Sequence, residues 1–404
     1  MSADPFEQRR LVQDARAVLW GGIAALMLAM GIGRFVYTPI LPDMLNEGQL
    51  SIAQAGWIAS ANFVGYLAGA LIAALIATPR QRLVWLRLAI VASVITTLAM
   101  AISPSIPMWL AVRCLSGIAS AFVLVFFVGF AGEAFARAER QHWTGWFFSG
   151  VGLGIAASAM LIEAMQQMAI NWRGLWLAAG DLAAVLALVA WYGTMRLELP
   201  KAAAMPADGA GGERLFGLAF VLLLGSYFCL GLGYIIDATY LPTLVRALPA
   251  LAGFGTLAWL VVGLSAAPSN PLWDSVARRI GRPLAMIIAF VLQAGGLLVP
   301  LVWSSVPGVA IAAVALGGTF MGITAMGLGH ARAISGHQAG RAVALMTAAF
   351  GLGQIAGPPI AGALVGKDGS FLWPTLLASA VLLLGAVLVG LSMLPPLRRR
   401  ADVA

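Results

Sequence analysis

The chain carries many uninterrupted apolar stretches, and their length constrains its fold more than any other feature. A helix that crosses a hydrocarbon core of roughly 30 Å needs about 20 predominantly apolar residues. With 61% apolar and only 10% charged residues, the composition lies outside the range of soluble domains, so we expect a protein embedded in a lipid bilayer. Twelve such stretches occur among the 404 residues, at 17–41, 52–77, 84–102, 107–131, 143–165, 173–193, 215–245, 253–273, 283–303, 307–329, 342–366 and 372–394.

The character of these stretches decides between the two structures that span membranes. Within lipid every backbone amide needs a partner inside the protein, so only helices and closed β-barrels cross the bilayer. Barrel strands alternate apolar and polar residues over about 10 positions. These stretches are longer, do not alternate between apolar and polar residues, and contain glycine. The sequence therefore predicts an all-α membrane protein with twelve transmembrane helices.

The positive charges predict the orientation, because cytoplasmic loops are enriched in Lys and Arg. With the N-terminus inside, nineteen of the 24 Lys and Arg residues lie in predicted cytoplasmic segments or at the cytoplasmic ends of spans, and only three lie in outer segments or at outer ends. The other two, Arg34 and Arg113, lie within spans. We expect a multi-pass protein of the cytoplasmic (inner) membrane with both termini in the cytoplasm. This distribution also accounts for the formal net charge of +8, so no nucleic-acid partner is expected.

An internal repeat predicts the arrangement of the spans. The segment "GIGRFVYTPILP" at 31–42 aligns without gaps on "GLGYIIDATYLP" at 231–242. Six spans, an even number, separate the two copies, so both copies run in the same direction across the membrane. The sequence thus predicts two parallel, pseudo-symmetric six-helix bundles, at 1–193 and 215–404. A polar, Pro/Gly/Ala-rich cytoplasmic linker is predicted between them, at 194–214.

Three charges within the predicted spans are candidates for function. A charge inside the membrane costs a few kcal/mol on insertion scales and normally faces a cavity or a partner. At 1.5 Å per residue, Arg34, Arg113 and Asp237 lie roughly 12, 9 and 8 Å from the predicted outer ends of their spans, so their depths are similar. The alternatives are a structural ion pair or a snorkelling side chain for the arginines, and a helix-breaking or surface role for Asp237.

Several motifs, in order along the chain, resemble those of the major facilitator superfamily of secondary transporters. "RCLSGIASA" at 113–121 resembles its fourth-helix R-x-x-x-G pattern, "NWR" at 171–173 its entry to helix 6, and "GQIAGPPIAG" at 353–362 its Gly/Pro-rich helix 11. The first copy of the repeat, at 31–42, and "AGWIASANFVGYLAGA" at 55–70 resemble the corresponding segments of the YbfB/YjiJ-type branch of this superfamily. The segment "GVGLGIAAS" at 150–158, in the fifth predicted span, lacks the proline of the family's antiporter motif.

This resemblance implies how the charged residues are arranged. In the family architecture helices 1, 4 and 7 surround a central cavity, which would place Arg34, Arg113 and Asp237 in one site. Asp237 and Arg113 are the candidates for proton coupling. Polar neighbours at helical spacing extend the set. The predicted substrate-binding or gating residues are Arg34, Tyr37, Asn62, Tyr66, Arg113, Tyr234, Asp237 and Gln354.

The predicted function is secondary active transport of a small molecule by alternating access, coupled to protons. Two arginines against one aspartate leave a positive surplus that suits a small organic anion. No phosphate-binding loop, zinc pattern or nucleophile with its base is found, so we predict no enzyme activity, no cofactor and no metal site, and we expect a monomer.

Two alternatives remain open at this point. A non-transporting sensor or scaffold is one of them, since such a protein can retain the fold. Efflux of amphipathic or aromatic compounds is the other. It would be favoured if four aromatic side chains faced the cavity, namely Phe63, Trp146, Phe147 and Phe228.

Overall fold

The computed structural model describes residues 5–47, 49–102, 105–199, 217–247, 249–366 and 369–394. The chain forms two compact units. Unit 1 comprises Met1–Ser51 and Ala61–Ala203, and unit 2 comprises Ile52–Ser60 and Ala204–Ala404. Most of the predicted linker, from residue 200 to residue 214, lies outside the described residues.

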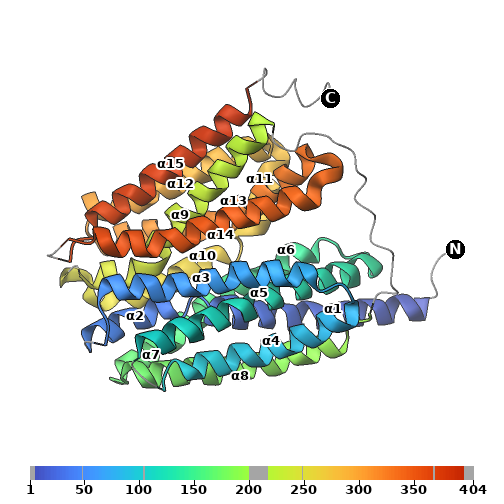
Figure 1. Cartoon of the computed structure of the whole chain (residues 1–404), viewed down its shortest axis with the longest axis horizontal. Coiled ribbons are helices and arrows are strands. Elements are labelled where there is room, and N and C mark those ends of the chain that lie inside the picture. Colours follow the sequence, from blue (N-terminus) through green and yellow to red (C-terminus); the bar gives the residue numbers. More distant parts are fainter. Residues whose placement is uncertain are drawn as a thin grey trace. The chain divides into compact units, whose positions relative to one another are not determined.

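Every helix of the described chain is named by its order in the sequence (Figure 1). Up to the predicted linker these are α1 Pro5–Leu26, the π-helix η1 Met27–Ile32, α2 Tyr37–Asn46, α3 Ile52–Leu75, α4 Pro79–Ala99, α5 Ile106–Arg137, α6 Trp143–Phe147, α7 Ser149–Gln167 and α8 Trp172–Met195. After it come α9 Leu218–Arg246, the 3-10 helix η2 Pro249–Phe254, α10 Gly255–Ala266, α11 Ser269–Ile280, α12 Arg282–Val302, α13 Val306–Ile334, the 3-10 helix η3 Gly336–Gln338, α14 Ala339–Leu364 and α15 Leu372–Ser392.

The described residues form helices and no strands, so the all-α prediction is confirmed for them. Eleven helical segments among these residues are long and apolar enough to cross a membrane. The predicted span 253–273 differs, because it is divided into the short α10 and α11 at Ala267 and Pro268. Proline lacks the N–H that a continuing helix needs and its ring collides with the preceding turn. Twelve continuous spans are therefore not confirmed.

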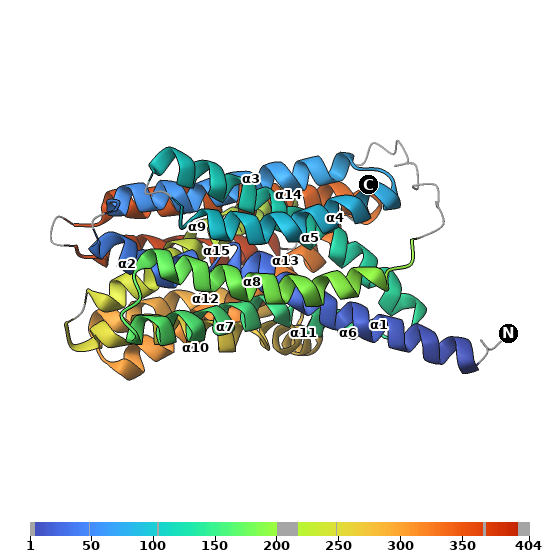
Figure 2. The same ribbon diagram turned by 90° about the horizontal axis from the view of Figure 1, so that it is seen from below.

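Each unit packs its helices around one or two central ones. In unit 1, α1 contacts α5, α7 and α8, and α4 contacts α5 and α8 (Figures 1 and 2). In unit 2, α9 contacts α13, α14 and α15, while α12 packs on α13 and α15. Many large apolar side chains remain exposed, among them Leu75, Leu188 and Val302. Exposed apolar surface on this scale suits lipid rather than water.

The two copies of the sequence repeat fold differently. The second copy lies within the continuous α9, whereas the first is interrupted by η1 and by a turn at residues 33–36. Pro39 explains the interruption, because its ring excludes a regular helical bond to the carbonyl of Phe35 four residues earlier. The aligned residue in the second copy is Thr239, whose hydroxyl donates to the carbonyl of Ile235 at 2.7 Å. Helix α2 then starts so that Pro39 falls in its first turn, where proline is tolerated.

Candidate functional site

The interruption in the first repeat exposes backbone carbonyls, and Arg113 of α5 binds them. Arg113 Nη1 donates to the carbonyl of Gly33 at 2.8 Å and Nη2 donates to that of Arg34 at 2.9 Å. The hydroxyl of Ser116, one turn further along α5, also donates to Gly33, at 2.9 Å. Helix α5 thus supplies the donors that the broken helix needs, which is the role of caps at ordinary helix ends.

Two further predicted residues hold Arg113 in place. Asn62 Nδ2 donates to the backbone carbonyl of Arg113 at 3.1 Å. The Tyr37 ring lies with its centroid 5.2 Å from Arg113 Cζ, which is within range of a cation–π interaction. A guanidinium that is bound to two carbonyls and lies beside an aromatic ring is stabilised without a carboxylate.

Arg34 has a different environment, although its carbonyl is bound by Arg113. Its side chain is buried, with Cζ 4.1 Å from the ring centroid of Tyr66, 5.3 Å from that of Phe63 and 5.9 Å from that of Phe35. Its Nε and Nη2 atoms have no hydrogen-bond partner. Among the described residues of unit 1, no carboxylate lies within 4.0 Å of it. A buried guanidinium with free donors is suited to bind an anion.

The structure therefore brings together all the predicted site residues of unit 1. Ser116 and Phe35 were missed by the sequence reasoning. Ser116 follows Arg113 by three positions and so shares its helix face, a signal that spacing alone provides. Phe35 carries no such signal, because its contact with Arg34 depends on the turn at 33–36.

The predicted residues of unit 2 form a second cluster on α9 and α14. The Tyr234 ring is stacked against Phe320 and Phe350, with centroids 5.3 and 5.6 Å apart. Gln354 Nε2 donates a short hydrogen bond to the Tyr234 hydroxyl. Asp237 lies one helical turn beyond Tyr234. Gln354 Oε1 and Asp237 Oδ2 are buried and have no hydrogen-bond partner.

The repeat relates the two clusters position by position. Arg34 aligns with Tyr234, and Tyr37 aligns with Asp237. The free polar atoms of the unit 1 cluster are arginine nitrogens and Asn62 Oδ1, whereas those of the unit 2 cluster are oxygens of Gln354 and Asp237. The arginine of the first copy is thus replaced by a neutral tyrosine in the second, and Tyr37 by a carboxyl residue.

The four aromatic residues linked to the efflux alternative have different environments. Phe63 lies beside the Arg34 guanidinium, whereas Phe147 packs against Phe127 and Phe135. Trp146 and Phe228 are exposed.

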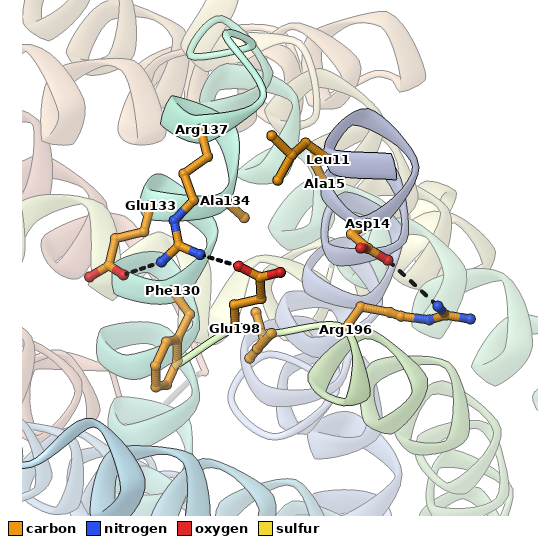
Figure 3. A pocket seen from close by; sticks show the side chains of 10 residues that line it. Leu11, Asp14, Ala15, Phe130, Glu133, Ala134, Arg137, Arg196 and Glu198 are labelled. Carbon is orange, nitrogen blue, oxygen red and sulfur yellow. Dashed lines mark hydrogen bonds and ion pairs between the residues drawn. The ribbon is translucent and has the colours of Figure 1, made fainter. Parts of the chain in front are cut away.

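A pocket of unit 1 lies elsewhere, between α1, α5 and the segment that follows α8 (Figure 3). Arg137 pairs there with Glu198 at 2.6 Å and with Glu133 at 3.7 Å, and Arg196 pairs with Asp14 at 3.5 Å. Asp14 precedes Arg34 by 20 residues, which would span roughly 30 Å at the rise of an α-helix. The charged side chains of this pocket are already paired with one another and are partly exposed, and such ion pairs contribute little to stability or to ligand binding.

Comparison with known proteins places the fold. A family model described as "uncharacterised MFS-type transporter YbfB" matches residues 26–390. A crystal structure of the nucleoside transporter NupG superposes with a TM-score of 0.67 at 14% identity, over 93% of this chain and 98% of that one. A single-residue variant of NupG gives a TM-score of 0.72 at 13% identity, over 93% and 100%. At these identities the likeness to NupG shows the fold alone.

Proposed function

Since the chain belongs to the family of MFS-type membrane transporters described as YbfB, we propose that it is a secondary transporter of a small organic anion. Transport would occur by alternating access between the two halves of the molecule, which is how transporters with repeated halves work. We place both termini in the cytoplasm and the chain, as a monomer, in the cytoplasmic membrane.

One observation carries the choice of an anion. Arg34 is buried among three aromatic rings, yet two of its nitrogen atoms lack a hydrogen-bond partner. Buried donors without partners cost about 1–3 kcal/mol, and more when charged. A carboxylate of the cargo would accept from these nitrogens and offset that cost. Arg113 already uses Nη1 and Nη2 to bind backbone carbonyls, so Arg34 is the better candidate for direct contact with the cargo.

We expect Arg34→Met to weaken binding of the transported anion by about 100-fold, since it removes a charged, desolvated hydrogen-bond donor. The measurement is uptake of labelled three- to six-carbon mono- and dicarboxylates into liposomes that contain the purified protein. Thermal unfolding with each compound measures binding separately. Nucleosides serve as neutral comparators, because the known structures with this fold include a nucleoside transporter.

Arg173→Gln is the matched control. Arg173 also lies over an aromatic ring, with Cζ 5.2 Å from the Trp172 centroid, but it is exposed. Transport by this variant should equal that of the unchanged protein. The proposal fails if Arg34→Met and the unchanged protein bind the same compounds equally, or if only neutral compounds are carried.

We further propose that Asp237 carries the coupling proton, because it is a buried carboxyl with one unpartnered oxygen. Asp237→Asn is expected to abolish the dependence of uptake on an imposed pH gradient, since an amide side chain does not gain or lose a proton at physiological pH. Exchange of labelled for unlabelled cargo across the membrane without a gradient should persist. Loss of both activities, or an unchanged response to the gradient, would contradict a coupling role.

A further inference from the structure

The cluster of unit 2 has a chemical character that the proposed anion site does not explain. Its free polar atoms are Gln354 Oε1, which can only accept, and Asp237 Oδ2, which accepts when the carboxyl is ionised. An acceptor oxygen repels a carboxylate and attracts an N–H or O–H group. We propose that Gln354 recognises a hydrogen-bond donor of the transported molecule, an alcohol hydroxyl or a protonated amine. This inference rests on the proposed transport function and specifies its cargo as a molecule with such a donor.

The surroundings of Gln354 hold its amide in one orientation. Its Nε2 donates to the Tyr234 hydroxyl, so that end of the amide is occupied. The Tyr234 ring is in turn stacked against Phe320 of α13 and Phe350 of α14, with an interplanar angle of 3° to each. These two stacking contacts restrict the movement of the ring and of its hydroxyl. The amide oxygen is therefore preorganised as an acceptor, which lowers the entropic cost of binding a donor.

The same cluster supplies a second acceptor when Asp237 is ionised. Asp237 follows Tyr234 by three residues on α9, or ~4.5 Å along the helix axis. Both side chains thus lie on one face of α9. An ammonium or a hydroxyl bound at Gln354 would therefore lie near a carboxylate, which strengthens a hydrogen bond from a charged donor.

A second buried glutamine shows that burial alone does not leave the amide oxygen free. Gln293 of α12 is as fully buried as Gln354. Its Oε1 accepts from the Thr319 hydroxyl at 3.0 Å, and its unpartnered atom is Nε2. Only Gln354 of this pair has an unused acceptor, which makes Gln293 a matched control.

The test uses small straight-chain compounds of several lengths and the purified full-length protein. One end of each compound carries a carboxylate or a methyl group, and the other carries a hydroxyl, a protonated amino or a methoxy group. A methoxy group accepts but cannot donate. Calorimetric titration should show the hydroxyl or amino compounds binding about tenfold more tightly than their methoxy counterparts, as expected for one hydrogen bond to a buried acceptor.

Gln354→Met should abolish this tenfold preference, and Gln293→Met should retain it. Tyr234→Phe keeps the stacked ring but removes the hydroxyl that orients the amide, so it should reduce the preference and provides a second test if the methionine variant does not fold. Equal affinity for all three end groups overturns the inference, even where carboxylates bind through Arg34. A donor preference without any effect of the carboxylate overturns the anion proposal instead, and no binding by any compound overturns both.

Discussion

Gly65→Leu is expected to abolish the folded protein. Helices α3 and α5 touch through their backbones at this position, and a Cβ atom built on Gly65 would lie 1.9 Å from the carbonyl oxygen of Cys114. Gly117 faces α3 as closely, with its added Cβ 2.0 Å from the carbonyl oxygen of Asn62. No side-chain rotation relieves a clash with backbone, so the helices must separate. Overpacking usually costs about 1–3 kcal/mol, and we expect a larger loss here. Size-exclusion chromatography and thermal unfolding in detergent measure it.

Gly129→Leu is the control on the same helix. Gly129 of α5 is exposed and an added Cβ meets nothing within 4 Å. Leucine favours the helix over glycine by roughly 0.5–1 kcal/mol, so this variant should be at least as stable as the unchanged protein. A monodisperse Gly65→Leu protein with an unchanged melting temperature would show that α3 and α5 do not approach so closely.

The second large effect is expected at Arg113. Arg113→Met removes the donors to the carbonyls of Gly33 and Arg34, and only Ser116 remains on one of them. A buried polar group left without its hydrogen-bond partner costs about 1–3 kcal/mol, and two carbonyls lose a donor here. The turn that carries Arg34 should loosen as well, so transport should be lost together with stability. Chemical unfolding in detergent and liposome uptake report the two effects.

Two milder changes test whether this bonding is responsible. Arg113→Lys keeps the charge but lacks the two-pronged guanidinium, and its stability should fall between those of the unchanged and methionine proteins. Ser116→Ala should lower the free energy of unfolding by only about 1 kcal/mol, because Arg113 still binds Gly33. If Arg113→Met kept full stability and lost only the response to a pH gradient, the coupling role predicted for Arg113 would be supported instead.

The sequence indicated several of the residues that the structure brings together in unit 1. Intramembrane charges singled out Arg34, and helical spacing linked it to polar neighbours, which the structure places in one cluster of unit 1. The roles within that cluster were not predictable. Arg34 and Arg113 look equivalent as isolated charges in apolar runs. Arg113 is bound to two carbonyls through Nη1 and Nη2 and leaves only Nε without a partner, whereas Arg34 has two nitrogen atoms without one.

The repeat shows why local structure was harder to predict than fold class. Its two copies align without gaps, so the same continuous helix is expected in both. The copies differ at most of their positions, and the difference with a direct effect on helical bonding is Pro39 against Thr239. The first copy is an interrupted helix and the second a continuous one. The predicted span at 253–273 was divided for a related reason, because Pro268 lies inside it, between α10 and α11.

The amino-acid sequence by itself determined the membrane location, the helical class and the family, because these depend on the length of apolar runs and on motifs within single helices. Only the tertiary structure decided which polar atoms are engaged and which are free. Arg113 and Gly33 are 80 residues apart, and Gln354 and Tyr234 are 120 apart. Hydrogen bonds over such separations depend on how helices pack, and no local pattern encodes the atoms that packing leaves without partners.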